Sequence, residues 1–524
     1  MIQGLMLAAA LAGAPYPVAE KSIADIQADL AAGRTTSVAV VQAYLRRIEA
    51  IDRKGPALHS IIALNPHLLA EARAADKARA AGAKPGPLAG IPVLLKDNIE
   101  SADDMATTVG SLALKDNVTG RDAPLVKRLT DAGALILGKS NLSEWANIRS
   151  DHSISGWSAI GGLVKNPYAL DRNACGSSAG TGAAIAASLA AAGVGTETDG
   201  SITCPSSLNG LVGLKPTVGL VSRTYVAPIS HSQDTPGPMT RSVADAALLL
   251  TAMAGSDPKD PATAEADSHR TDYVAALAGA SLKGKRLGVV RYTTGLPPGE
   301  VALFDATLKT LAAQGAEIVE LPDLHPDPAM GEAEAIILMT ELKADLNAYL
   351  ASTPPQVRTR TLKDVIAFDE ASPRELALFG QELFVKADQT GGLTDSSYLK
   401  AKQTAGRLSR AEGIDAVMGR YHLDALVGPS YGPAWRTDVV TGDHDSGAIG
   451  SIAAVAGYPH LTVPMGQVTG LPVGFSFVGP AWSEAKLLAL GAAFEAAVAG
   501  RKPPTYAASV EAEPDIAKAL EPLK

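Results

Sequence analysis

The sequence predicts an α/β protein in which helices cover a β-sheet. Short apolar segments typical of strands alternate along the chain with segments whose apolar residues recur at helical spacing, and this alternation is typical of a covered sheet. The chain has 524 residues, of which 46% are apolar and 19% are charged. Such a composition can fill a large core and is not that of a disordered chain.

The N-terminal part predicts three helices and then a strand that ends in a lysine. Residues 22–53 have apolar positions at helical spacing that are broken at Gly33 and restart at a Thr-Thr-Ser cap signal, which predicts two helices. The segment HLLAEARAADKARAAG predicts a third helix. The short apolar strand from Ile91 to Leu95 follows and delivers Lys96 at its end.

Strand and helix patterns continue towards the C-terminus around one long helical segment. The segment APLVKRLTDAGALILGKSNLSEWA predicts a helix, a turn, a strand and a second helix. Residues 327–419 have a mostly helical pattern, which predicts a lid or cap inserted in the α/β body. The strand pattern returns at LDALVGPS, YPHLTVPMG and PVGFSFVG.

Charge and cysteine content exclude several classes of function. The net charge is -9 and no basic patch has interleaved aromatic residues, so we expect no nucleic-acid partner. Two cysteines, Cys175 and Cys204, exclude a disulfide scaffold and a cysteine-built zinc site. The nine histidines give no HExxH pattern, so we expect no metal and no metal cofactor. No segment has the length and apolarity of a membrane span.

Residues 1–20, MIQGLMLAAALAGAPYPVAE, have an apolar run followed by small residues. This pattern is similar to the apolar region and cleavage zone of a signal peptide, although a charged region before it is missing. It favours a periplasmic or secreted protein. The alternative is a flexible apolar N-terminus on a cytoplasmic protein.

Candidate chemistry is concentrated between Lys96 and Ser201. Gly176 to Gly180 match the G-x-S-x-G pattern with Ser178 at the centre, but that pattern requires an apolar strand before it, and KNPYALDRNAC is polar. The glycines are not followed by the lysine of a phosphate-binding loop. We therefore interpret this segment as a loop that leads into a helix from about Ala179 to Ala192.

The segment GTETDGSITCPSS, residues 195–207, is polar although it follows an almost wholly apolar run. Gly200 allows a backbone turn in which successive amides converge on one point, and acyl transfer needs such amides beside a nucleophile. Ser201 is the serine in that position. No histidine lies in this segment, and Lys96 is the candidate base because burial at the end of an apolar strand would lower its pKa. Ser483, in SEAK, is interpreted as a helix cap.

These residues resemble the amidase signature family. The motifs that carry the resemblance, in the family's order and spacing, are GPLAGIPVLLKDNI, DAGALILGKSNLSEWA, NPYALDRNACGSSAG, TETDGSITCPSSLNGLVGLKPTVGLVSR, SQDTPGPMTRSVADAALLL, LDALVGPS and GLPVGFSFVG. They cover about residues 22–500, and SEWAN, DHSISGWSA, CGSSAG and SITCPSS are most like the bacterial peptide amidases.

The resemblance implies a Ser–cis-Ser–Lys triad. Ser201 would be the nucleophile, Ser177, which lies 24 residues before it, the bridging serine, and Lys96 the base. A cis peptide bond between Gly176 and Ser177 is implied as well. The implied oxyanion hole consists of the backbone amides of Thr198, Asp199, Gly200 and Ser201. No cofactor is implied.

The resemblance also implies a fold and an activity. The fold is a central mixed, twisted β-sheet with helices on both faces, as an amidase domain over residues 21–505, with a mostly helical insertion at roughly 327–420 and a C-terminal tail at 506–524. Asp234 and Arg241 match the family and would support the site structurally. Cys175 replaces a common glycine and is interpreted as a small buried residue, with a disulfide to Cys204 as the alternative in an exported protein.

The implied reaction is hydrolysis of carboxamides, with peptide C-terminal amides as the expected substrate and ammonia as a product. The alternatives are aryl amides, esters or carbamates as substrates of the same fold, or a glutaminase subunit resembling that of the tRNA amidotransferase. The expected partner is a small-molecule or peptide amide substrate. Whether the protein is a monomer or a homodimer stays open.

Overall fold

Eleven strands form one mixed sheet in the computed structural model, which describes residues 15–291, 295–321, 325–447 and 449–522. Three neighbouring strands near each end of the sheet run parallel to one another, and the pairings between these two groups are antiparallel. In order across the sheet the strands are β1 (Ile61–Leu64), β3 (Leu135–Ser140), β2 (Pro92–Lys96), β6 (Ala192–Glu197), β8 (Thr235–Thr240), β7 (Val212–Lys215), β12 (His460–Val468), β13 (Leu471–Val478), β11 (Ala425–Pro429), β9 (Arg286–Val289) and β10 (Glu317–Glu320).

A separate two-stranded hairpin consists of β4 (Trp157–Ser158) and β5 (Gly162–Leu163). The α-helices of the described residues are α1 (Ile23–Ala31), α2 (Ser37–Arg47), α3 (Leu68–Ala80), α4 (Pro124–Asp131), α5 (Ala179–Ala186), α6 (Thr203–Leu208), α7 (Val243–Met253), α8 (Ala266–His269), α9 (Pro298–Ala313), α10 (Pro328–Ala351), α11 (Leu362–Ala371), α12 (Glu382–Asp388), α13 (Ser396–Gly406), α14 (Asp415–Tyr421), α15 (Ser451–Ala456), α16 (Glu484–Val498) and α17 (Pro514–Leu520).

Helices pack on both faces of the sheet, as predicted, and β12 illustrates the two faces. Successive side chains of a strand point to opposite faces. Leu461 lies against Gly491 of α16. Thr462 points the other way, to the side where Gly474 N donates a hydrogen bond to Ser207 Oγ of α6 at 2.9 Å. The central sheet is therefore buried between α6 and α16, and the mixed α/β fold class is confirmed.

The first two helices begin and end where the sequence places them. The Ser22 side chain accepts from the backbone of Asp25, and the Asp25 side chain accepts from the backbone of Ser22, which is a capping box at the start of α1. Gly33 makes the turn after α1 with φ of +67°. Thr36 caps α2 by accepting from Ala39 N.

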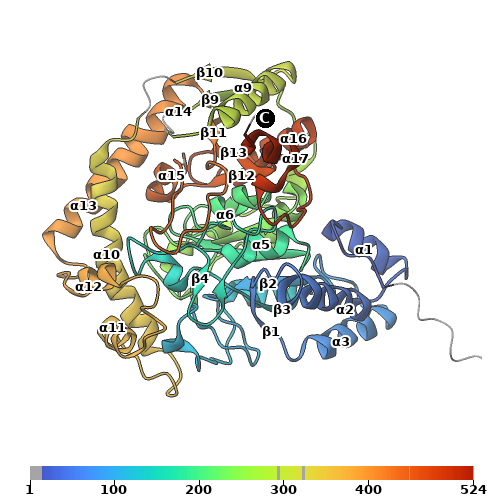
Figure 1. Cartoon of the computed structure of the whole chain (residues 1–524), viewed down its shortest axis with the longest axis horizontal. Helices are drawn as coiled ribbons and strands as arrows, with labels where there is room; N and C mark the ends of the chain where they lie inside the picture. Colours follow the sequence, from blue (N-terminus) through green and yellow to red (C-terminus); the bar gives the residue numbers. More distant parts are fainter. Residues whose placement is uncertain (1–14, 292–294, 322–324, 448, 523–524) are drawn as a thin grey trace, which may run out of the picture.

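The chain between β10 and β11 is helical and contains α10 to α14. Figure 1 shows these helices, in yellow to orange, along one side of the molecule, beyond the end of the sheet strands. α10 is 24 residues long and packs against α12 and α13. α10 lies beside the sheet, and its C-terminal end contributes to the wall of a cavity described below.

Two helices that the sequence predicts are shorter than expected. The predicted helix from Ala179 to Ala192 ends at Ala186, since the chain turns at Ser188, which has φ of +53°, and strand β6 begins at Ala192. The Arg241 guanidinium holds the connection by donating to Ile185 O and Ala190 O. Strand pairing here overrides the helix propensity of alanine. The helix predicted after β3 is only a 3₁₀ turn, Glu144–Asn147.

The prediction that the Ser483 side chain caps a helix is wrong. Ser483 is the residue before α16, but its side chain makes no capping hydrogen bond. Glu484, the first residue of α16, instead receives a hydrogen bond from Thr217 N at 2.6 Å. The predicted position of the N-cap was therefore correct, but the predicted side-chain hydrogen bond is not formed.

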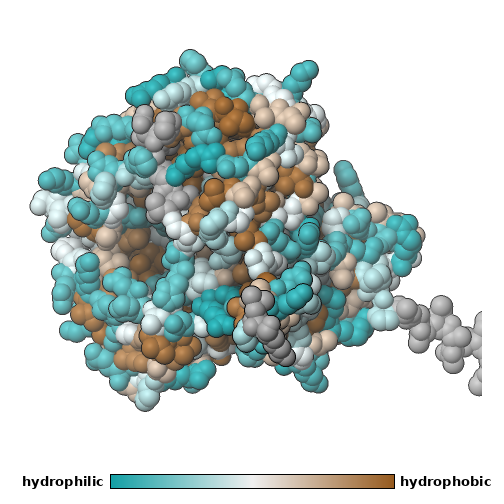
Figure 2. All heavy atoms as spheres, turned by 45° about the horizontal axis from the view of Figure 1, so that its top comes forward, coloured by the Kyte–Doolittle hydropathy of each residue, from teal (hydrophilic) through white to brown (hydrophobic). Residues whose placement is uncertain are grey.

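Hydrophilic side chains cover most of the face in Figure 2, and apolar residues form separate patches among them. Within the described ranges, no helix is both long and apolar enough to cross a membrane. Residues 1–14, which make up most of the predicted signal peptide, lie outside the described residues.

Candidate active site

Lys96 is the last residue of β2 and lies beside the end of β6. The two strands are paired in parallel, so both reach the same edge of the sheet with their carboxyl ends, which is where α/β proteins commonly bind ligands. Lys96 Nζ lies 2.7 Å from Ser177 Oγ, 2.9 Å from Thr196 Oγ1 and 3.2 Å from Thr196 O. Asn98 Nδ2 donates to the same Thr196 Oγ1 at 2.9 Å. The amine is therefore fixed by Ser177 and Thr196.

Burial changes the acid–base behaviour of Lys96. The residue is 0% exposed, and its hydrogen-bond partners are neutral oxygens. Removal from water lowers the pKa of Lys96 to about 7, against the opposing influence of the carboxylates of Asp234 and Glu197. The amine consequently exists in both protonation states near neutral pH, as a general base requires.

Ser177 follows a cis peptide bond after Gly176, as the resemblance implies. Its backbone oxygen accepts from Ser143 N at 3.0 Å, and the residue is 0% exposed. A side chain on residue 176 would collide with Ser143 Oγ and would force Ser143 to move. Contacts before and at Ser177 thus fix this residue, and its hydroxyl lies at hydrogen-bond distance from Lys96 Nζ.

Ser201 lies in the turn between β6 and α6. Its backbone oxygen accepts from Ser178 N at 3.2 Å, which ties the turn to the residue that follows Ser177. Gly200 has φ of +80°, and a side chain there would also collide with the Tyr431 hydroxyl. Ser201 is 9% exposed whereas Ser177 is 0% exposed, so Ser201 is the more accessible of the two serines.

The backbone amides of this turn are available to a ligand. Within the described residues, the N–H groups of Thr198, Asp199, Gly200 and Ser201 donate no hydrogen bond to another residue. A left-handed glycine in such a turn lets neighbouring N–H groups converge.

Two carboxylates stabilise the turn. Glu197 Oε2 accepts from Ile202 N at 2.8 Å and from Thr203 N at 2.9 Å, so it occupies the start of α6. Asp234 Oδ1 accepts from Thr198 Oγ1 at 2.6 Å. Both carboxylates are therefore structural supports for the Ser201 turn.

A cavity of about 430 Å³ opens beside these groups, a size that is typical of small-molecule sites. Ser177, Asn98, Thr196 and Thr198 contribute to its wall. Much of the remaining wall is the segment from Arg223 to Pro236, here called the cavity loop. The end of α10 completes it with Asp345, Ala348 and Tyr349, together with Ser352 just after the helix. Lys96 and Ser201 are not among the lining residues.

A disulfide joins Cys175 to Cys204, with 6.0 Å between their Cα atoms. Cys175 immediately precedes the Gly176–Ser177 bond, and Cys204 lies in the first turn of α6, three residues after Ser201. The two cysteines are 5% and 3% exposed. The sequence favoured Cys175 as a small buried residue; it is buried, and the alternative, a disulfide to Cys204, is present.

We expect reduction of this disulfide to lower the free energy of unfolding by roughly 3–4 kcal/mol, because the cross-link closes a loop with a sequence separation of 29 residues. Urea unfolding with and without a strong reductant measures the difference. The Cys175→Ser/Cys204→Ser double variant is the control, since the reductant should not move its urea midpoint. Equal midpoints for the reduced and oxidised wild-type protein would contradict the prediction.

Sequence reasoning missed several residues around Lys96 and the cavity. Asn98 lies two residues beyond Lys96, in the turn that follows β2. Thr196 immediately precedes Glu197 in the polar segment that carries Ser201. His231 and Asp345 line the cavity from the cavity loop and α10, and no motif in the sequence connects them.

Comparison with known proteins identifies the family. The family model described as Amidase matches residues 39–488. The chain belongs to the amidase signature family. The amidase is 41% identical to a probable amidase of Arabidopsis thaliana over 94% of this chain and 93% of that protein.

A solved structure of the peptide amidase PAM with the competitive inhibitor chymostatin is 52% identical in sequence to this amidase. The match covers 94% of this chain and 100% of that chain, with a TM-score of 0.90. The glutamyl-tRNA(Gln) amidotransferase of Alkalilimnicola ehrlichii has one subunit that is 35% identical over 90% of this chain and 96% of its own length. These findings establish the protein as an amidase, a hydrolase.

Proposed function

We propose that this amidase hydrolyses peptide C-terminal amides through an acyl-enzyme on Ser201, with Ser177 as the bridging serine and Lys96 as the base. The observation that carries the proposal is the contact of 2.7 Å between the buried Lys96 amine and Ser177 Oγ. The pKa of Lys96, about 7, leaves a large fraction of its amine neutral at pH 7.

Proton transfer starts at the neutral amine. With two N–H groups donated to Thr196, the lone pair of Lys96 accepts from the Ser177 hydroxyl. Ser177 in turn takes the proton of Ser201 as the Ser201 oxygen attacks the amide carbonyl carbon. Ser177 is a relay because a hydroxyl donates and accepts at the same time.

The oxyanion formed in this attack is stabilised by the amides of Thr198, Asp199, Gly200 and Ser201, which make no hydrogen bonds to other described residues. Lys96, through Ser177, then returns a proton to the leaving nitrogen, and ammonia departs. Water attacks the acyl-enzyme by the same relay and releases the carboxylic acid. No cofactor takes part in this reaction.

Peptide amides are the proposed substrates for two reasons. The cavity wall combines apolar residues such as Val226 and Ile229 with hydrogen-bonding groups such as Asn98, and the similar solved protein is named a peptide amidase. We expect N-acetylated dipeptide amides to be hydrolysed with kcat/KM at least roughly tenfold above that of anilides, esters, carbamates and free glutamine, a margin of about 1.4 kcal/mol in transition-state binding. Ammonia, aniline or alcohol release measures the panel at equal enzyme concentration.

Preference for free glutamine would instead indicate a glutaminase, and preference for anilides, esters or carbamates would indicate another acyl specificity of the same site. Either result would contradict the proposed substrate class. The Ser201→Ala variant is the matched blank for every substrate.

We also propose that the protein works in the periplasm or outside the cell. The Cys175–Cys204 disulfide supports this location, since disulfides persist in oxidising compartments. Fractionation of the native host tests the proposal. Recovery of the protein in the cytoplasmic fraction with both thiols free would overturn it.

A further inference from the structure

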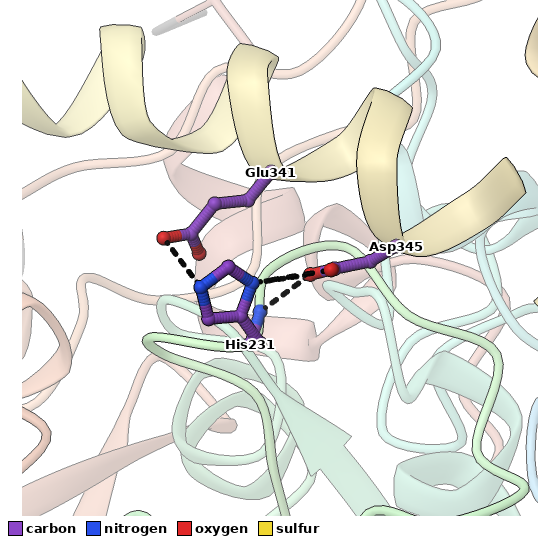
Figure 3. A group of neighbouring side chains, drawn as sticks. All are labelled: His231, Glu341 and Asp345. Carbon is purple, nitrogen blue, oxygen red and sulfur yellow. Dashed lines mark hydrogen bonds and ion pairs between the residues drawn. The ribbon is translucent and has the colours of Figure 1, made fainter. Parts of the chain in front are cut away.

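His231, in the cavity loop, lies between two carboxylates of α10 (Figure 3). Its Nδ1 lies 2.9 Å from Asp345 Oδ2, and its Nε2 lies 3.2 Å from Glu341 Oε1. The picture places Glu341 and Asp345 at the two opposite nitrogens of the ring. The imidazole side chain is 40% exposed, whereas Glu341 is fully buried.

This arrangement favours a doubly protonated ring, because both carboxylates attract its charge. A neutral imidazole has one N–H, so it can donate to one carboxylate only and would present a lone pair to the other. An imidazolium donates to Asp345 and forms an ion pair with Glu341. The hydrogen bond to Asp345 raises the pKa of His231, burial opposes the increase, and the charge of Glu341 adds to it.

His231 belongs to a continuous row of polar contacts between the cavity loop and α10, here called the seam. Ser230 Oγ and Ser232 Oγ both donate to Glu341, each at 2.5 Å. His231 N donates to Asp345 Oδ2 at 2.8 Å. Gln233 Nε2 donates to Glu334 Oε1 at 2.7 Å. Four consecutive residues of the loop are thus bound to one helix, and the His231 imidazole and the Lys402 ammonium lie beside the carboxylates of that helix.

The same three side chains have the composition of a metal site, but their contacts argue against one. The two carboxylates lie at different nitrogens of the ring, and a single ion can bind only one of these two nitrogens. The Lys402 ammonium lies 3.4 Å from Glu341 Oε1, and Tyr398 OH donates to the same oxygen at 2.7 Å. Glu341 therefore has its charge and lone pairs already satisfied.

We propose that His231 is a positioning residue for substrate binding: as an imidazolium it clamps the cavity loop to α10 and so holds together the two walls of the cavity. The proposal rests on the proposed amide hydrolysis at this cavity, because His231 and Asp345 both line it. Loss of the ring proton removes the positive charge between Glu341 and Asp345 and so loosens the seam.

The pH dependence follows from the charges around the ring. Glu341 and Asp345 of α10 face it and favour the charged form, while Lys402 of α13 disfavours it. Tyr398 OH lies 3.5 Å from Nε2, and an Arg223 guanidinium nitrogen donates to the His231 carbonyl. Since the folded-state pKa is raised, the clamp is complete at low pH and is lost as the pH rises through that pKa. Substrate affinity therefore falls as the pH rises.

Steady-state kinetics with a peptide amide between pH 5.5 and 9 test the clamp. We expect the KM of the wild-type protein to rise roughly tenfold across the His231 titration, because the ion pair with Glu341 is lost and the hydrogen bond to Asp345 loses its charge assistance. His231→Gln should remove this pH dependence and keep the high KM at every pH. Asp345→Asn should move the midpoint to lower pH, because it removes a charge that favours the imidazolium.

His67→Gln is the matched control. His67 forms a similar pair with Asp104, at 2.7 Å, on a surface that does not line this cavity. Its KM profile should equal that of the wild-type protein. A KM rise that persists in His231→Gln, or a midpoint that Asp345→Asn leaves in place, would overturn the proposal.

Hydrogen exchange of the seam provides a readout that needs no turnover. After correction for intrinsic exchange rates, peptides covering residues 229–234 and 334–346 should be less protected at pH 8.5 than at pH 6 in the wild-type protein. His231→Gln should show low protection at both values. If no amide is hydrolysed at any pH while this exchange pattern holds, the proposed function fails and the clamp stands; equal protection at both pH values in the wild-type protein would overturn the clamp.

Discussion

Ser201→Ala is expected to lower kcat for peptide-amide hydrolysis by roughly 10⁴- to 10⁶-fold, as removal of a serine nucleophile does in other acyl-transfer enzymes. The loss is large because no other hydroxyl can take the place of the attacking atom: Ser177 is 0% exposed and is bound to Lys96. Ammonia release, measured at substrate concentrations above KM, gives the change in kcat. KM or the dissociation constant of a peptide inhibitor should change little.

Ser178→Ala is the matched control for this variant. Ser178 is the central serine of the literal G-x-S-x-G pattern, and its Oγ hydrogen-bonds the backbone of Thr196. Removal of such neutral hydrogen bonds should lower turnover by no more than roughly tenfold. Retained activity in Ser201→Ala together with loss in Ser178→Ala would make Ser178 the nucleophile and contradict the proposed triad.

Lys96→Met is the second variant with a large expected effect. General bases contribute typically 10²- to 10⁴-fold to a rate, so we expect kcat to fall by about that factor at pH 7. The methionine side chain is apolar and of similar length, and Lys96 is fully buried with hydrogen bonds to neutral oxygens. The variant should therefore fold, with a melting temperature at or above that of the wild-type protein.

The pH profile of the wild-type enzyme provides the control for Lys96. Since only the neutral amine accepts a proton, kcat should be low in acid and rise as the pH increases through a pKa of about 7. Lys96→Arg should remain inactive at every pH up to 9, because arginine stays protonated. Turnover of Lys96→Met that equals the wild-type value at pH 7 would exclude the lysine as the base.

The candidate catalytic residues could be predicted because their signals are local. Lys96 ends an apolar strand, Ser201 follows a turn glycine in a polar segment, and the family motifs connect both with Ser177. The cis bond at Ser177 was available only through the resemblance, since no composition or periodicity indicates it. The mixed sheet with helices on both faces was likewise predicted from alternation and resemblance together.

The substrate cavity could not be predicted, because its walls meet only in three dimensions. The cavity loop contacts α10, which follows it by about a hundred residues, through side chains such as Ser232 and Glu341 that are ordinary surface residues by sequence. The helix that was predicted to reach Ala192 ends early for a similar reason. The residue at which it was predicted to end, Ala192, instead begins β6 and pairs with Val93 of β2, and local propensity carries no information on such pairing.

Because β2 pairs with β6 in parallel, recovery of catalytic activity during refolding reports whether these two strands have paired in the native register. Lys96 is the last residue of one strand, and Thr196, which binds its amine, lies one residue before the end of the other. A slip of one residue in their register would turn the lysine to the opposite face of the sheet, although most apolar burial would survive. During refolding, recovery of secondary structure and recovery of turnover should therefore separate in time, and the interval between them measures how long misregistered chains persist.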